Sequence, residues 1–140
     1  MRFWDTSAVV PLLIKQSASA KADHWYAEDP GIAIWTLATV EIVSALWRLR
    51  RDKSLTEANV RAAELRSEEL ASASYIVADT DSVKNLAARL LRVHALRAAD
   101  ALQLGAALIW AGAQPQGKTL HTLDERLALA GRREGFDVPD

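Results

Sequence analysis

The stretch Arg2-Phe3-Trp4-Asp5-Thr6-Ser7 is a short apolar run that ends in an acid and two hydroxyl residues. An apolar run followed by residues that favour helix starts is typical of a strand leading into a helix. We therefore predict a strand at 2–4 and a short helix over 6–14, which Pro11 kinks or ends.

Short apolar runs alternate with helical patterns along the rest of the chain. Further strands are predicted at 32–35, 75–78 and 118–122, with 136–138 as a candidate fifth strand. Helices are predicted over 17–28, 36–51, 54–71, from 79 to a break at 94–96, from there through 110, and over 123–130. Two of these starts match the capping-box pattern, Ser54 with Glu57 and Thr122 with Glu125. Alternating strands and helices imply one α/β domain over 1–140, with a mainly parallel sheet of four to five strands flanked by helices.

Composition limits the classes of protein to consider. The 140 residues are half hydrophobic and a quarter charged, as in an ordinary globular domain. The chain has no cysteine, which excludes disulfides and thiolate metal sites. Its net charge of −1 gives no overall attraction for nucleic acid. There is no apolar run long enough to span a bilayer and no secretory signal pattern, so we expect a soluble, cytoplasmic protein without membrane contact.

Two acids follow predicted strands. Asp5 comes after the strand at 2–4, and Asp124 after the strand at 118–122. Ligands of parallel α/β sheets bind beyond the carboxyl ends of the strands, so both acids are site candidates. Taken alone, Asp5 is better explained as the N-cap of the helix that follows, and Asp124 is equally well explained as a first-turn acid.

Glu41 lies in an otherwise apolar predicted helix. At a rise of 1.5 Å per residue it lies about 7–8 Å from the helix start, and therefore near the same sheet edge. The alternative is an exposed stripe in which Glu41 pairs with Arg48. The apolar neighbours favour a site role.

Asp100 interrupts an alanine-rich helical segment, where an unpartnered buried carboxylate would be costly. The alternative partner is Arg97, with Gln103 extending a narrow polar stripe. The small residues at 105–107 predict close helix packing, which favours an inward-facing carboxylate. We therefore predict that Asp5, Glu41, Asp100 and Asp124 form one site.

Four carboxylates at one sheet edge would repel one another without a cation. Hard oxygen ligands favour Mg²⁺, or else Mn²⁺. Such an ion lowers the pKa of bound water and orients a phosphodiester, while a nearby acid serves as general base. Whether one or two ions act is left open.

These acids and their surroundings resemble the PIN-domain family, particularly the small VapC-type toxins of bacterial toxin–antitoxin pairs. The resemblance extends over nearly the whole chain and is carried by four motifs in order and by a Gly-Phe pair: WDTSA at 4–8, TLATVEIVSAL at 36–46, LRAADALQL at 96–104, TLDERL at 122–127 and GF at 135–136.

The resemblance implies a Mg²⁺- or Mn²⁺-dependent endoribonuclease that acts on single-stranded or looped RNA. It places the family's acidic quartet on Asp5, Glu41, Asp100 and Asp124, and its hydroxyls on Thr6 or Ser7 and on Thr122. It also implies a homodimer and a cognate antitoxin that fills the active-site groove. His121 departs from the family, which more usually has an apolar residue there, and we assign it no catalytic role.

Residues outside the motifs give weaker signals. Arg97, next to Asp100, is a candidate contact for an RNA phosphate, whereas the cluster of Arg48, Arg50, Arg51 and Lys53 is typical of a solvated helix end. His24 and His94 lack the spacing of metal ligands. The five tryptophans are expected mainly in the core or a dimer interface, although they could stack on bases.

Three other functions compete with this interpretation. A dehalogenase-type phosphohydrolase needs a second Asp where this chain has Ser7. A phospho-receiver domain would use Asp79 or Asp81, but needs a lysine at the end of its last strand, and Lys118 is at the beginning. Neither accounts for Glu41 and Asp100 together. A catalytically silent PIN-like module that binds RNA or protein is the third alternative, and the intact quartet argues against it.

Overall fold

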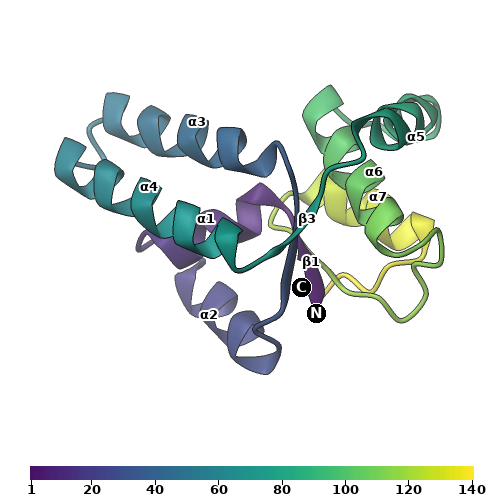
Figure 1. The fold of residues 1–140 in the computed structure, drawn as a ribbon, viewed down its shortest axis with the longest axis horizontal. Coiled ribbons are helices and arrows are strands. Elements are labelled where there is room, and N and C mark those ends of the chain that lie inside the picture. Colours follow the sequence, from purple (N-terminus) through teal and green to yellow (C-terminus); the bar gives the residue numbers. More distant parts are fainter.

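A parallel four-stranded sheet separates two groups of helices in the computed structural model, which describes residues 1–140 (Figure 1). The strands are β1 (Arg2–Trp4), β2 (Ile32–Trp35), β3 (Tyr75–Val77) and β4 (Leu120–His121). Their order is β3-β2-β1-β4, and every neighbouring pair is parallel. The predicted α/β class, with a parallel sheet of four to five strands flanked by helices, is confirmed.

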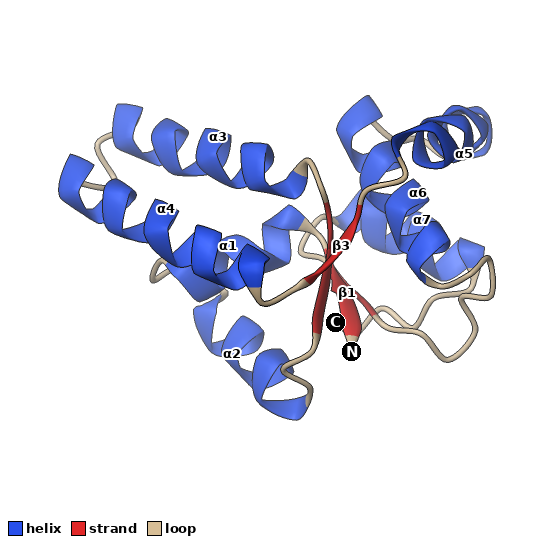
Figure 2. Cartoon of the chain, viewed as in Figure 1, coloured by secondary structure: helices blue, strands red, loops and turns tan.

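Seven helices cover the two faces of the sheet, with four on one side and three on the other (Figures 1 and 2). The first group is α1 (Thr6–Leu13), α2 (Ser19–Glu28), α3 (Ala38–Arg51) and α4 (Glu57–Ser72). The second group is α5 (Thr80–Val93), α6 (Ala98–Trp110) and α7 (Glu125–Glu134). None of the helices is both long enough and apolar enough to cross a membrane.

Strand alternation divides the buried apolar residues into two cores. Phe3, Ala33 and Trp35 pack against α5–α7, whereas Trp4, Ile32 and Ile34 pack against α1–α4. Successive strand residues point to opposite faces, so a strand covered on both sides must be apolar throughout. All four residues of β2 are buried for this reason.

Two expectations about the carboxyl-terminal segment are wrong. The last helix continues to Glu134 instead of ending at 130, and Gly135 ends it with φ 103°, a left-handed conformation that glycine adopts readily. Residues 136–138 form no strand, because the chain then runs beside β4 only briefly. Its pairing is a single parallel bridge between Thr119 and Asp137.

Both predicted capping boxes are also wrong. The N-cap of α4 is Thr56, whose side chain accepts a hydrogen bond from the Asn59 backbone N–H, and the N-cap of α7 is Asp124. Both helices start later than the boxes require, because Thr56 and Asp124 have extended backbones. The break at 94–96 is confirmed, since α5 ends at Val93 and α6 starts at Ala98. Pro11 lies inside α1, which ends two residues later.

Gly105 permits the close packing of α5 and α6 that the small residues at 105–107 predicted. A Cβ atom at this position would lie 3.0 Å from the Val83 carbonyl oxygen and 3.4 Å from the Ala87 nitrogen. Both are backbone atoms of α5 and have little freedom to move. Because α6 carries Asp100 and Gln103, this packing also positions side chains of the site described below.

We expect Gly105→Leu to lower the free energy of unfolding by about 1–3 kcal/mol, because the added side chain forces α5 and α6 apart. Urea unfolding measures the change. The matched control is Ala88→Leu, which adds a side chain of the same final size at an exposed position of α5 and should leave stability nearly unchanged. Equal effects of the two substitutions would contradict the packing argument.

Candidate active site

All four predicted acids lie at the amino ends of helices. Asp5 and Asp124 are the N-caps of α1 and α7, and Glu41 and Asp100 lie in the first turns of α3 and α6. Glu41 and Asp100 lie within their helices as expected, but closer to the amino ends, because α3 and α6 begin only three and two residues before them. A helix amino end carries partial positive charge, which stabilises a carboxylate there.

Asp5 is buried, and one of its oxygens is held by three hydrogen bonds. Its Oδ2 accepts from the Ser7 backbone N–H at 3.1 Å, from the Ser7 hydroxyl, and from Thr122 Oγ1 at 2.9 Å. Burial raises the pKa of Asp5 to about 6; the bonds from Ser7 and Thr122 lower it, and the charge of Glu41 adds to the rise. Asp5 is therefore a carboxylate that would be stabilised by a nearby cation.

Glu41 is held by α1 and α6, not by Arg48. Thr6 Oγ1 donates to Glu41 Oε2 at 2.8 Å, and Gln103 Nε2 donates to the same oxygen at 2.8 Å. Gln103 also donates to Thr6 Oγ1 at 3.0 Å. The exposed Glu41–Arg48 stripe does not form.

Gln103, which the sequence interpretation placed only in a narrow polar stripe beside Arg97 and Asp100, contacts one of the predicted acids. It is buried, with 1% of its surface exposed, and joins α6 to both α1 and α3. The available signal was a glutamine in an apolar helix three residues after Asp100, which puts both on one helix face. The spacing could not show that its partner is Glu41, which is distant in sequence.

Thr122 and Ser7 connect the two N-cap acids. Thr122 Oγ1 accepts from the Asp124 backbone N–H at 3.1 Å while it donates to Asp5. Ser7 Oγ lies 3.2 Å from Thr122 Oγ1 and accepts from the Leu123 N–H at 2.8 Å. All three predicted hydroxyls, those of Thr6, Ser7 and Thr122, thus hold the acids or the backbone beside them.

Asp100 stands apart from these bonds and forms no ion pair with Arg97. Burial raises its pKa, and the negative charge of Asp124 raises it further, while Arg97 and Arg126 oppose the shift. The charge of Asp124 therefore acts on Asp100. Arg97 is exposed and unpaired at the start of α6.

The free carboxylate oxygens fit a hydrated Mg²⁺ or Mn²⁺ ion. Asp5, Glu41 and Asp124 each use a single oxygen in hydrogen bonds, which leaves Oδ1, Oε1 and Oδ2 respectively without a protein donor. None of the four acids forms an ion pair with a basic side chain. No three acidic or histidine side chains converge as a complete metal cage. Mg²⁺ commonly keeps several waters and takes one or two carboxylates, so it suits this open arrangement.

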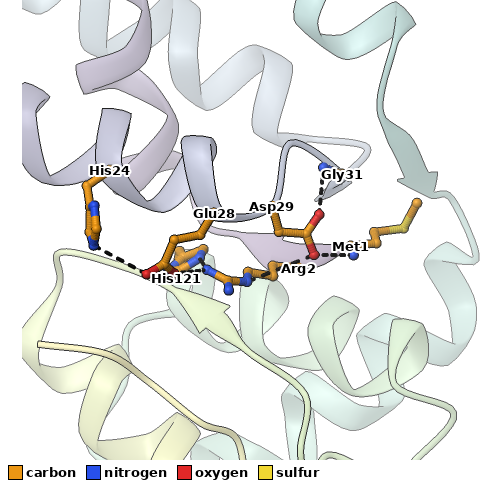
Figure 3. Close-up of polar contacts among 7 residues, drawn as sticks. All are labelled: Met1, Arg2, His24, Glu28, Asp29, Gly31 and His121. Atoms are coloured by element: carbon orange, nitrogen blue, oxygen red, sulfur yellow. Dashed lines mark hydrogen bonds and ion pairs between the residues drawn. The ribbon is translucent and has the colours of Figure 1, made fainter.

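His121 lies in the core, on the side of the sheet covered by α2. Its ring is stacked on Trp25 at a centroid distance of 4.4 Å and lies 4.6 Å from the ring of Trp4. Arg2 lies between His121 and Glu28, with its Nη1 3.4 Å from His121 Nε2 and 2.8 Å from the Glu28 carboxylate (Figure 3). Burial, assisted by the Arg2 charge, lowers the pKa of His121 to about 4. The ring is neutral near neutral pH and makes no hydrogen bond to the four acids.

The remaining histidines and the tryptophans also lie outside the site. His24 is exposed and pairs with Glu28, and His94 contacts Glu134. Three tryptophans are buried, and two are half-buried: Trp4, Trp25 and Trp35, then Trp47 and Trp110. Their packing agrees with the predicted core role.

We expect Asp5→Asn to remove a pH-dependent loss of stability from the metal-free protein. At pH values well below the ordinary pKa of 3.8, the Asp5 carboxyl is protonated in both the folded and the unfolded protein. As the pH rises through about 4 to 6, the unfolded chain loses the proton first, so wild type loses up to about 3 kcal/mol relative to the variant. Asparagine keeps an oxygen that can accept from Ser7 and Thr122.

Urea unfolding with a chelator, at a series of pH values, measures this difference. Asp79→Asn is the control: Asp79 is an exposed N-cap whose pKa is lowered by its bond with Ser82. Removing the Asp79 carboxylate should not relieve any loss of folding stability as the pH rises. Parallel pH profiles for wild type and Asp5→Asn would show that burial does not raise the pKa of Asp5.

Comparison with known proteins agrees with this fold. Residues 2–132 match the model of the PIN domain family. Ribonuclease VapC45 and Ribonuclease VapC49 of Mycobacterium tuberculosis are each 36% identical to this chain over 137 residues, which cover 97% of this chain and 92% of each relative. The crystal structure of VapC20 from the same organism, described as a sarcin-ricin loop cleaving toxin, superposes with a TM-score of 0.67 at 19% identity, covering 94% of this chain and 95% of VapC20. The chain belongs to the PIN-domain family.

Proposed function

We propose that this protein is a divalent-metal-dependent endoribonuclease that cleaves single-stranded or looped RNA. The observation that carries the proposal is the group of four carboxylates, without basic partners, at the amino ends of α1, α3, α6 and α7. The family and its two relatives named ribonucleases supply the reaction class.

Asp5 and Asp100 are the proposed principal ligands for Mg²⁺ or Mn²⁺, with Glu41 and Asp124 completing the site directly or through water. A bound ion would polarise the phosphodiester, activate water and neutralise the leaving oxygen. The protein residues orient these ligands: Thr6 and Gln103 hold Glu41, and Ser7 and Thr122 hold Asp5. A free carboxylate oxygen can also accept the proton of the attacking water. Arg97, exposed at the start of α6, is the proposed contact for a phosphate of the substrate.

We propose further that the protein is the toxin of a cytoplasmic toxin–antitoxin pair, that it forms a homodimer, and that a cognate antitoxin inhibits it. The names of the VapC relatives support this assignment. Large apolar side chains are exposed over α3 and α4, namely Leu37, Val40, Val43 and Leu65. Exposed apolar groups on neighbouring helices favour contact with another protein.

The two phosphate-chemistry alternatives find no matching site. Asp79 caps α5 and Asp81 pairs with Lys84 at the surface, so neither acid lies in a receiver-type pocket. Ser7 donates to Asp5 and cannot replace the general acid of a dehalogenase-type enzyme. A silent RNA- or protein-binding module is the remaining alternative, and the assay below distinguishes it.

We expect purified protein, freed of any antitoxin, to cleave a broad RNA pool with Mg²⁺ or Mn²⁺ and to stop when a chelator is added. Asp100→Asn should reduce kcat/KM by at least about 100-fold, since it removes a charge that stabilises the reacting centre. Circular dichroism should show a retained fold. Glu68→Gln, at an exposed position of α4, is the charge-matched control. Absence of cleavage by wild type with either ion would favour the silent module.

Gln103→Leu tests the positioning of Glu41. The variant cannot donate to Glu41 or Thr6, so we expect metal affinity or activity to fall about 10–100-fold, as for other residues that orient metal ligands. Isothermal titration with Mn²⁺ measures affinity separately from cleavage. Leu102→Ala, on the neighbouring position of α6, is the packing control. Unchanged Mn²⁺ affinity and activity in Gln103→Leu would contradict the positioning role.

A further inference from the structure

The α5–α6 linker, residues 94–97, leads into the helix that presents Asp100. Asp100 is the third residue of α6 and therefore lies three residues beyond the linker. Inside the linker the backbone forms one hydrogen bond, from the Leu96 N–H to the His94 carbonyl. The Leu96 side chain packs against the core on that side of the sheet. The remaining attachment of the linker is the side chain of His94.

His94 is held to the end of α7 by Glu134. The His94 side chain is only 7% exposed, and its Nε2 donates to Glu134 Oε1 at 2.8 Å. An ionised carboxylate only accepts hydrogen bonds, so the imidazole nitrogen is the donor. The other ring nitrogen, Nδ1, is buried and has no hydrogen-bond partner. Glu134 therefore makes the only hydrogen bond that fixes the direction of this ring.

Glu134 also binds α5. Arg89 donates to its two carboxylate oxygens at 3.4 and 2.8 Å. Burial raises the pKa of Glu134, but the hydrogen bonds from Arg89 and His94 outweigh burial and hold the pKa below its usual value. A half-buried carboxylate with two such donors is a stronger connection than an exposed ion pair. Glu134 thus joins the last turn of α7 to α5 and to the linker.

The linker runs along α7 from Glu134 toward the carboxylate site. It lines a small hollow together with α7 residues from Arg126, in the first turn, to Arg133, in the last. Asp124 caps the start of α7, and its charge acts on Asp100 at the start of α6. The contact with Glu134 therefore lies at one end of the linker and the two acids at the other.

We infer that Glu134 is a positioning residue that, through His94, sets where Asp100 stands beside Asp124. The inference rests on the proposed function and adds to it a residue remote from the reacting atoms. Without the Glu134 carboxylate, the buried His94 ring has no hydrogen-bond partner, which favours local opening of the linker. The start of α6 is then less firmly held. A metal ion that takes oxygens from both α6 and α7 would bind such a site more weakly.

The first experiment follows hydrogen exchange of single backbone amides by NMR in the metal-free protein. The Ala101 N–H reports on the start of α6, because it donates to the Arg97 carbonyl at 3.0 Å. The Glu41 N–H, which donates to the Leu37 carbonyl at 3.1 Å, is the corresponding amide of α3. We expect Glu134→Ala to speed exchange at Ala101 by about 10-fold and to leave exchange at Glu41 unchanged.

Two further variants separate this role from general stability. Glu134→Gln keeps an oxygen that can accept from His94, so it should restore most of the protection at Ala101. Arg132→Ala is the matched control, because Arg132 lies in the same turn of α7 but binds residues beyond the helix instead of the linker. It should leave exchange at Ala101 unchanged. Equal acceleration at Ala101 and Glu41 in Glu134→Ala, or no acceleration at all, would overturn the inference.

The second experiment measures Mn²⁺ affinity by isothermal titration, well below the unfolding temperature of every variant. We expect Glu134→Ala to bind Mn²⁺ several-fold more weakly than wild type, with Glu134→Gln and Arg132→Ala close to wild type. Unchanged Mn²⁺ affinity in Glu134→Ala would overturn the positioning role even where exchange at Ala101 rises. Absence of Mn²⁺ binding by wild type would count against the proposed function, whereas exchange at Ala101 would still support or overturn the connection between Glu134 and α6.

Discussion

The burial of carboxylates beside one another, Asp5 with Glu41 and Asp100 with Asp124, is the constraint on which the rest of the site depends. Each acid lies at a helix amino end, where the partial positive charge of the backbone offsets part of its negative charge. None of the four acids forms an ion pair with a basic side chain. Burial raises the pKa values of Asp5 and Asp100, and the charges of Glu41 and Asp124 respectively raise them further. The arrangement is stable as a fold, but it favours a cation.

Hydrogen bonds from hydroxyl and amide groups fix the shape of the site without neutralising it. Ser7 and Thr122 hold a single oxygen of Asp5, and Thr6 and Gln103 hold a single oxygen of Glu41. A lysine or arginine in these places would satisfy the charge and compete with a metal ion. Neutral donors orient the carboxylates and leave their second oxygens available, so a cation would meet a site that is already ordered.

More of the fold than of the site could be predicted from the sequence. The strands at 2–4 and 32–35 follow from apolar runs, and the break before α6 follows from the length of the helical pattern. The caps could not be assigned, because Ser54, Thr56 and Glu57 satisfy two overlapping capping patterns, and only the backbone decides between them. Glu41 and Asp100 remain proposed site residues. Both are first-turn acids, and Glu41 contacts α1 and α6, which helical spacing alone could not indicate.

Gln103 and His121 show why tertiary contacts limit such predictions. Both are polar residues in apolar surroundings, and both are fully buried. Gln103 meets Glu41 and Thr6, so its polarity serves the site, whereas His121 is packed between two tryptophans and is neutral. Sequence spacing relates each residue only to its own helix or strand. The difference between a positioning residue and a core residue is decided by partners from distant segments: α1 and α3 for Gln103, and α2 for His121.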